Sequence, residues 1–293
     1  METFVRQLDS RYIEVLNTSS WWKQLVDIVN NNQNYNIQLR NNYLNVYYKM
    51  NSLFKIDFNS KSLLITMHYK FIPIIKIQPK GKEYINVNIT DEKLLLESHI
   101  EQDRLTEDLL SNLKRIEKQI DMFHGNEKYY QSKLIEKNNT IILDAEVQSE
   151  FGRIDLIALI DNQIIAIELK RLFDDRLHKS EIDEQLLNYS KFMQQNSDEI
   201  LKAYINSINI KKELGIVGVD NNTSEYLSSL KVCEKPILAI VADVPYKKQD
   251  VIDLYKNDFF ERFRNTTYAI YMFGDVADFT NFSSNSKLST NEN

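Results

Sequence analysis

The chain has 293 residues, of which 43% are hydrophobic and 27% charged, with 6 glycines, 4 prolines and 1 cysteine. This composition is typical of a globular protein with a sizeable core, and it excludes collagen-like and linker-rich chains. No glycine-rich phosphate loop occurs, which argues against a nucleotide-driven motor or kinase. One cysteine builds neither a disulfide framework nor a cysteine-based zinc site. Without an apolar signal core or a long apolar run, we expect a cytoplasmic protein that does not span a membrane.

The net charge of −6 is unevenly distributed along the chain. Residues 1–90 hold 11 basic and 6 acidic side chains, whereas the remainder holds 25 and 36. A basic front and an acidic rear are typical of a polyanion-facing module joined to a carboxylate-rich one. So small a positive surplus is also ordinary, and charge alone leaves both interpretations open.

The first 90 residues predict a small β-rich domain. Residues 4–30 have the apolar periodicity of a helix, and short alternating segments follow at 37–49, 53–58, 62–69 and 84–89. Asn51-Ser52 is expected to form a turn between strands.

One side of this front sheet combines basic and aromatic side chains: Arg40, Tyr43, Tyr47, Lys49 and Lys55. Basic and aromatic faces bind nucleic acid. They also occur at the edges of ordinary sheets, so this face supports either interpretation.

Residues 91–124 are expected to form a helical linker, which begins at Thr90-Asp91-Glu92 and reaches about Phe123. Within it, apolar residues from Leu109 to Phe123 follow alternating spacings of four and three. About two heptads fit, which suits a packing helix or a short dimer seam. Residues 125–280 then alternate between helical and strand patterns, and we expect a mixed α/β (α+β) sheet flanked by helices. Residues 281–293 are expected to form a polar, frayed tail.

The expected rear elements follow one another closely. Helices are predicted near 126–137, 181–195 and 198–208, and strands near 141–147, 153–160, 164–170, 237–243 and 267–273, with a further helix between the last two strands.

Two apolar segments flank the polar pair Asp161-Asn162, which predicts a β-hairpin with a two-residue loop. With that loop, Asp155 lies directly across from Glu168. Side chains alternate along a strand, so Lys170 shares the face of Glu168. One face of the hairpin therefore presents two acids and an amine together. A three-residue loop would shift the register by one residue, and Asp155 would then no longer lie across from Glu168.

Two carboxylates and an amine at this spacing suit the hydrolysis of a phosphodiester. Facing carboxylates repel unless a cation lies between them, and Mg²⁺ is commonly held by one or two carboxylates with water and phosphate oxygens. Such an ion acidifies a water molecule and neutralises charge on the phosphate. A nearby lysine orients or deprotonates that water, or stabilises the charged transition state. The simpler alternative is a salt bridge in which Lys170 pairs with Asp155 or Glu168.

Two flanking helices carry polar side chains that suit the same site. Glu127 lies on the apolar stripe of the first helix, which normally faces the sheet, although a first-turn acid is also favoured by the helix dipole. In the helix over 181–195, Gln185 and Tyr189 lie one turn apart on or beside the apolar stripe. They either bond buried backbone groups or reach the acidic cluster.

This order of residues resembles the PD-(D/E)XK nuclease superfamily, and most of all the branch of the NucS/EndoMS DNA endonucleases. The resemblance covers roughly residues 113–200 and consists of Glu127, then Gly152-Arg153-Ile154-Asp155, then Ile167-Glu168-Leu169-Lys170, then Gln185 and Tyr189. Ile154 departs from it, because the superfamily pattern has proline there. Residues 1–90 and 210–280 carry no matching motif.

The resemblance implies a restriction-endonuclease-like fold and Mg²⁺-dependent hydrolysis of phosphodiester bonds, with Mn²⁺ as a substitute. It assigns Asp155 and Glu168 to metal binding, with the carbonyl of Leu169 as a third protein ligand. It assigns Lys170 to the attacking water and Glu127 to a metal-bound water or a supporting position. Gln185 and Tyr189 are assigned to positioning.

An acidic nuclease must approach DNA through local basic surface. The candidates are Arg40, Lys49 and Lys55 in front, and Arg153, Arg171 and Arg176 beside the site. We therefore expect a homodimeric, metal-dependent deoxyribonuclease that cuts DNA endonucleolytically, in restriction, repair or phage defence. Two alternatives stay open: a nucleic-acid-binding or interaction module of the same fold that no longer cuts, and an RNA-directed nuclease.

Overall fold

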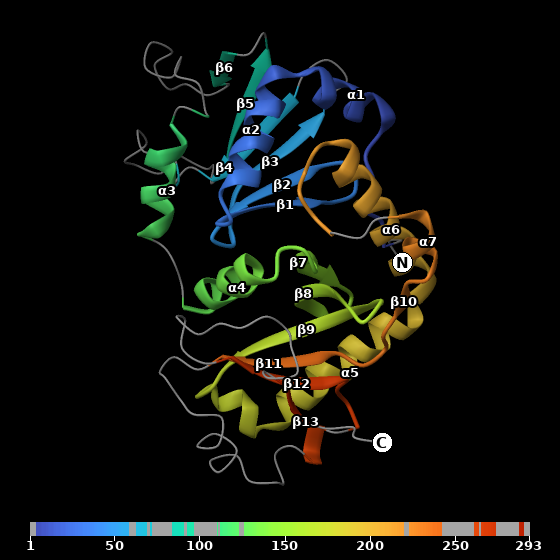
Figure 1. The fold of residues 1–293 in the computed structure, drawn as a ribbon. Coiled ribbons are helices and arrows are strands. Elements are labelled where there is room, and N and C mark those ends of the chain that lie inside the picture. Colours follow the sequence, from blue (N-terminus) through green and yellow to red (C-terminus); the bar gives the residue numbers. More distant parts are fainter. Residues whose placement is uncertain are drawn as a thin grey trace. The chain divides into compact units, whose positions relative to one another are not determined.

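The computed structural model (Figure 1) describes residues 4–58, 63–68, 71, 84–90, 93–96, 110, 112–122, 126–219, 223–241, 261–263, 265–273 and 287–289. The chain forms two compact units. The front unit comprises Val5–Tyr129 and Asn209–Val217, and the rear unit comprises Met1–Phe4, Tyr130–Ile208 and Gly218–Asn293. Among the described residues, no helix is long and apolar enough to cross a membrane.

The front unit contains a six-stranded antiparallel sheet in which consecutive strands are neighbours. The strands are β1 (Tyr35–Leu39), β2 (Leu44–Tyr48), β3 (Asn51–Phe58), β4 (Leu63–His68), β5 (Tyr84–Thr90) and β6 (Lys93–Leu96). β4 alternates between buried and half-buried residues, which is the pattern of a strand that covers a core with one face, whereas β1 and β2 each end in three consecutive buried residues.

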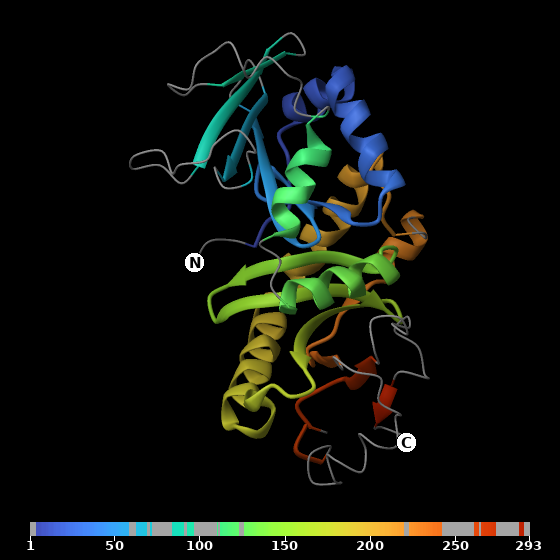
Figure 2. The same ribbon diagram turned by 90° about the vertical axis from the view of Figure 1, so that its left-hand side faces the viewer.

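Three helices share that core: α1 (Ser10–Thr18), α2 (Ser20–Asn31) and α3 (Leu113–Asp121). Figure 2 shows all three on the same side of the front sheet. Buried hydrogen bonds hold two of them in place: Tyr12 of α1 donates to the carbonyl of Ile56 over 2.7 Å, and the Trp22 indole of α2 donates to the carbonyl of Leu214 over 3.3 Å.

Three predictions for this part of the chain are wrong in detail. The helix over 4–30 is two helices, because Ser19 has an extended backbone and caps α2 by accepting from the Trp22 amide. Residues 37–49 form most of a hairpin, and the turn that follows lies at Lys49 and Met50, which both have positive φ. The helix expected from Thr90 is interrupted by β6, whose backbone pairs with β5; only α3 is helical among the described residues of that stretch.

The rear unit contains a mixed seven-stranded sheet in the order β13-β12-β11-β9-β8-β7, with β10 paired beside β9. Its strands are β7 (Ile142–Ser149), β8 (Gly152–Ile160), β9 (Gln163–Arg171), β10 (Lys231–Val232), β11 (Ile237–Val241), β12 (Ala269–Phe273) and β13 (Lys287–Ser289). β7, β8 and β9 are antiparallel, whereas β9, β11 and β12 are parallel.

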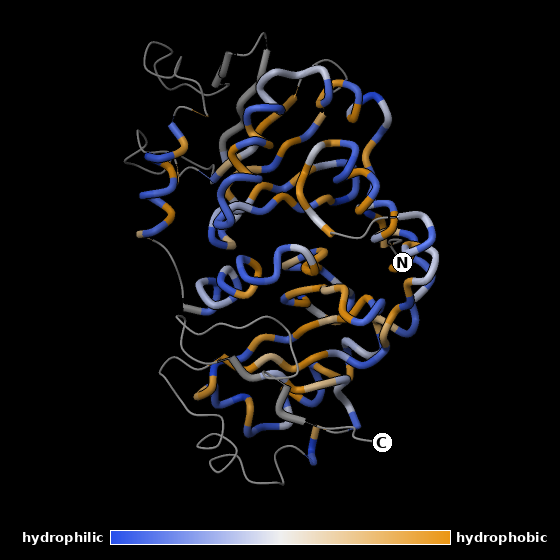
Figure 3. The backbone as a smooth tube through the Cα atoms, in the orientation of Figure 1, coloured by the Kyte–Doolittle hydropathy of each residue, from blue (hydrophilic) through white to orange (hydrophobic). Residues whose placement is uncertain are grey.

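The helices that follow are α4 (Asn126–Lys137), α5 (Ser180–Gln195), α6 (Ser197–Glu213) and α7 (Ser224–Ser228), with the 3-10 turn η3 (Asp175–His178) before α5. Residues 126–129 of α4 and 209–213 of α6 belong to the front unit, and the other residues of these helices belong to the rear unit. Side chains of α5, α6 and α7 pack with those of β7, β8 and β9 in one apolar cluster. A second cluster joins η3 and α5 to β11 and β12. β8 and β9 are apolar along most of their length (Figure 3), as expected of central strands covered on both faces.

The predicted fold class is confirmed: a β-rich front sheet is followed by a mixed sheet flanked by helices. The predicted rear helices and strands lie within a few residues of their expected ranges, apart from a longer α6, whereas α7 and β10 were not predicted. The helix expected between 243 and 267 falls largely on residues outside those described. β13 lies within the segment predicted as a frayed tail, where it pairs with β12.

Candidate active site

The hairpin of β8 and β9 has the predicted register. Its pairs run from Ile160↔Gln163 to Leu156↔Ile167, so the loop has two residues. Asp161 and Asn162 both have positive φ, 52° and 59°, as a two-residue hairpin turn requires.

The ladder between β8 and β9 ends at Leu156↔Ile167, one pair before the predicted pair of Asp155 and Glu168. From there β9 continues beside β11, and Glu168 pairs with Leu238. Beyond the ladder, a side chain of β8 bonds the backbone of β9: Oδ2 of Asp155 accepts from the amide of Leu169 over 2.8 Å. The carboxylate of β8 is thereby fixed against β9, although not as a direct cross-strand partner.

Glu168 and Lys170 form a buried ion pair on one face of β9, with exposed fractions of 1% and 2%. Nζ of Lys170 donates to Oε1 of Glu168 and also to the carbonyl of Leu169, at 3.3 Å. The salt bridge left open by the sequence is therefore present. The two oxygens that receive this ammonium group are two of the three that the resemblance assigns to a metal ion.

Tyr189 of α5 joins Asp155, Glu168 and Lys170 in one buried cluster. Its hydroxyl lies 2.6 Å from Oε2 of Glu168 and 2.6 Å from the carbonyl of Arg153, and it accepts from Gln185 over 2.9 Å. Burial, and then the negative charges of Glu168 and Asp155, raise the pKa of Tyr189 above its ordinary value. The hydroxyl therefore keeps its proton and acts as a donor to this site.

Helix α4 contacts β8 through Gln131, one turn after Glu127. Glu127 is exposed in the first turn of the helix, and among the described contacts of the cluster none involves it. One turn later, Gln131 is 2% exposed and donates to the carbonyl of Asp155 over 2.8 Å. The sequence signal for Gln131 was present, since an amide on an apolar stripe needs a buried partner.

The three basic residues expected beside the site lie in different settings. Arg153 is exposed and pairs with Glu146 over 2.9 Å. Arg171 is half-buried at the end of β9. Arg176 pairs with Asp174 over 2.6 Å, and its hydrogen bonds hold the pKa of that carboxyl below its ordinary value.

Glu146 is a further acid at this end of the sheet that the sequence did not reveal. It has a φ of 54° inside β7, between the pairs Ala145↔Leu156 and Val147↔Ile154. That position lies across the ladder from Asp155. Its salt bridge to Arg153 joins the two strands at the edge of the cluster.

The basic residues expected on the front sheet are only partly available to a ligand. Arg40 is 8% exposed, so little of its side chain lies at the surface. Lys49 is half-buried and pairs with Asp121 over 2.8 Å. Lys55 pairs with Asp57 over 2.9 Å and lies 4.1 Å from the ring centroid of Tyr43, with 40% of its side chain exposed.

The donor set of the rear cluster fits a hard divalent cation by its chemistry. Asp155, Glu168 and the carbonyl of Leu169 supply oxygen ligands, and Mg²⁺ takes few protein oxygens together with water and phosphate. Among the described residues, no group of three or more histidine, cysteine, aspartate or glutamate side chains is placed to hold a metal. Any ion here therefore depends on the two carboxylates and the backbone carbonyl.

A scan against models of protein families, a search of curated proteins and a search of solved structures found no match to this chain. Fold and site together define the class: a two-unit mixed α/β protein with a buried cluster of Asp155, Glu168, Lys170 and Tyr189 where two antiparallel strands separate.

Proposed function

We propose that this chain is a metal-dependent nuclease that hydrolyses phosphodiester bonds of DNA. One observation carries the proposal: the ammonium group of Lys170 binds Oε1 of Glu168 and the carbonyl of Leu169, beside the carboxylate of Asp155. Two acids, a carbonyl and an amine are thus gathered where the PD-(D/E)XK resemblance assigns metal binding and water activation.

Each residue of the cluster has a role in this proposal. Asp155, Glu168 and the carbonyl of Leu169 would hold Mg²⁺ or Mn²⁺. When bound, such an ion lowers the pKa of a water molecule and offsets charge on the phosphodiester. Lys170 would orient the attacking water or donate to the phosphate. Tyr189, held by Gln185, fixes the carboxylate of Glu168.

The proposed reaction balances as a simple hydrolysis. The water oxygen forms a bond to phosphorus, the bond between phosphorus and one sugar oxygen breaks, and that oxygen takes a proton. Glu127 is proposed to contact a metal-bound water or to support the site, since it lies one turn before Gln131 on α4. The homodimer and the DNA contacts of the exposed basic residues also belong to this proposal.

A second candidate, a nucleic-acid-binding module that no longer cuts, is favoured by one specific observation. Glu168 is 1% exposed, and both of its carboxylate oxygens contact groups of the protein itself. In that case Lys170 would be the permanent partner of Glu168. Divalent metal would then find no binding site at the cluster.

Cleavage assays separate the two candidates. Wild type, Asp155→Ala and Lys170→Ala are incubated with plasmid, single-stranded DNA and RNA, with Mg²⁺ or Mn²⁺. Lys191→Ala is the matched control, because Lys191 is exposed on α5. We expect cuts in DNA by wild type and Lys191→Ala, and at least about 100-fold slower cleavage by the two site variants. Equal rates for wild type and Asp155→Ala would overturn the proposal that the chain is a nuclease. Cleavage of RNA faster than of DNA would make RNA the substrate.

A further inference from the structure

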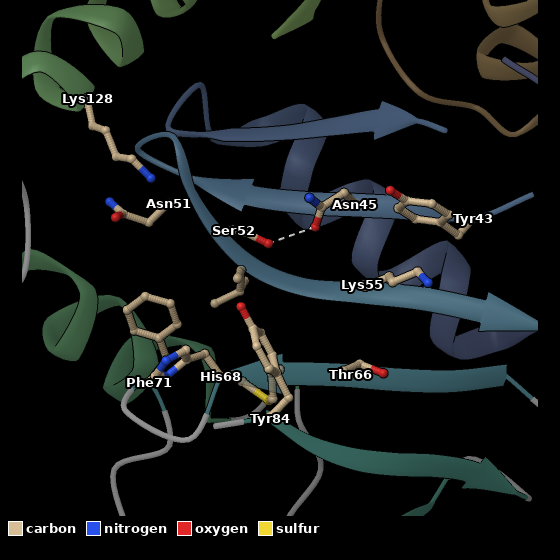
Figure 4. A pocket seen from close by; sticks show the side chains of 12 residues that line it. Tyr43, Asn45, Asn51, Ser52, Lys55, Thr66, His68, Phe71, Tyr84 and Lys128 are labelled. Atoms are coloured by element: carbon tan, nitrogen blue, oxygen red, sulfur yellow. Dashed lines mark hydrogen bonds between the residues drawn. The ribbon is translucent and has the colours of Figure 1, made fainter. Parts of the chain in front are cut away.

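A pocket of about 340 Å³ lies on the front sheet, among residues of β2, β3, β4 and β5 (Figure 4). Its floor lies on the face of the sheet opposite α1 and α2. Phe54 and Ile56 of β3 are buried in the core, whereas Lys55 between them points to the opposite face and lines the pocket. The pairing of β2 with β3 shifts register after Val46, so the sheet is irregular beside the pocket.

Two cross-strand rows supply the polar and aromatic groups. In the first row, Asn45 pairs with Lys55, and Lys55 pairs with Thr66. In the second row, His68 pairs with Tyr84, and their rings meet edge to face with centroids 5.2 Å apart. Tyr84 is 58% exposed, so one aromatic ring at the pocket is open to a ligand.

The charged side chains around the pocket favour an anionic ligand. Lysine side chains approach it from opposite ends, Lys55 from β3 and Lys128 from α4 (Figure 4). None of the described lining residues is aspartate or glutamate, in a chain with 42 acidic and 36 basic side chains. The salt bridge between Lys55 and Asp57 is partly open to water, with 40% and 28% of the side chains exposed, so a phosphate can compete for the lysine.

We propose that this pocket binds one nucleotide unit, with the base against the ring of Tyr84 and the phosphate at Lys55. An exposed aromatic ring, two cationic ends and neutral amide and hydroxyl groups between them match a ligand that joins a flat ring to an anion. A volume near the lower end of the usual ligand range, about 300–1,000 Å³, suits a single unit. The inference goes beyond the proposed nuclease, because the pocket lies within the front unit and binding requires no cleavage.

The nucleotide has two possible sources, a free mononucleotide or one residue of single-stranded DNA, and titration distinguishes them. Full-length chain carrying Asp155→Ala, which prevents hydrolysis, is titrated calorimetrically with deoxynucleoside monophosphates and with a short thymidine oligomer. Binding of the monophosphates supports a free nucleotide as the ligand, and binding of the oligomer alone supports single-stranded DNA. Binding of neither overturns the proposal.

Pocket variants assign the binding to this site. In the same background, Tyr84→Ala and Lys55→Gln should each weaken binding about tenfold, because stacking and a phosphate contact are lost. Tyr84→Phe keeps the ring and should bind as the parent does. Lys23→Ala, an exposed lysine on α2 in the same unit, is the charge-matched control. Unchanged affinity in both Tyr84→Ala and Lys55→Gln, with circular dichroism showing a folded chain, would overturn the pocket as the site.

Discussion

Oε1 of Glu168 accepts a hydrogen bond from the ammonium group of Lys170, two residues later on β9, and both side chains are almost completely buried. A buried ion pair contributes little net stability, but removing one partner leaves a charge without compensation. The pair also occupies an oxygen that a metal ion would need. In the proposed nuclease, lysine and metal would therefore compete for Glu168, and this competition can be measured.

Replacing Lys170 with methionine should make the protein depend on divalent metal. Without metal, Lys170→Met should lose about 3–5 kcal/mol of unfolding free energy, because Glu168 keeps its burial and loses its cation. Excess Mn²⁺ should then raise the unfolding temperature of the variant more than that of wild type, since the ion replaces the ammonium group. Thermal unfolding with and without Mn²⁺ measures both effects.

The control for this competition is the double variant Lys170→Met/Glu168→Gln. It has no charge at either position, so Mn²⁺ should leave its unfolding temperature nearly unchanged. An equal response to Mn²⁺ in the double and single variants would place the metal elsewhere.

Tyr189→Phe should destabilise the rear unit by about 1–3 kcal/mol, because Glu168 and the carbonyl of Arg153 lose the hydroxyl that contacts them. The folded-state pKa of Tyr189 is raised above the ordinary value of 10.0, so its contribution is complete below pH 10. As the pH rises further, the unfolded chain ionises first and the advantage of wild type shrinks. Urea unfolding of both proteins from pH 7 to pH 11 measures this difference. A constant difference across that range would show that Tyr189 ionises normally.

The sequence was sufficient for the hairpin because all of its determinants are local. A polar pair between two apolar segments specifies the two-residue loop, and the loop fixes the register down to Leu156↔Ile167. Beyond that pair, the local sequence does not determine how β8 and β9 lie. No local pattern marks where β8 separates from β9, while β9 continues to pair along its other edge with β11. Asp155 therefore reaches the amide of Leu169 instead of facing Glu168.

The surroundings of the front basic residues are likewise set by residues far away in the chain. Alternation along a strand separates two faces but does not say which side chains find later partners. Lys49 pairs with Asp121, and Arg40 is buried by the packing of the unit. Residues 93–96 contain three leucines, a short run that suits a helix or a strand, and pairing with β5 decides between them.

Glu127 and Gln131 provide a matched pair on one helix. Gln131→Leu should destabilise the protein by about 1–3 kcal/mol, because the buried carbonyl of Asp155 loses its donor. Glu127→Ala removes an exposed side chain and should change stability by less than about 0.5 kcal/mol. If Glu127 assists hydrolysis, its variant should cut DNA at least about tenfold more slowly while unfolding as wild type does. Wild-type cleavage by Glu127→Ala would remove this residue from the proposed site.

The turn at Asp161 and Asn162 tests whether the hairpin register controls the site. Asn162 has a φ of 59°, which glycine adopts freely and a β-branched residue adopts only with strain. Asn162→Gly should therefore stay within about 1 kcal/mol of wild type, whereas Asn162→Val should lose about 1–3 kcal/mol. A strained loop also weakens the register that brings β8 to β9, so Asn162→Val should cleave DNA more slowly even where it is fully folded. Urea unfolding and cleavage assays on the two variants check both expectations, and equal stability of the glycine and valine variants would contradict the turn conformation.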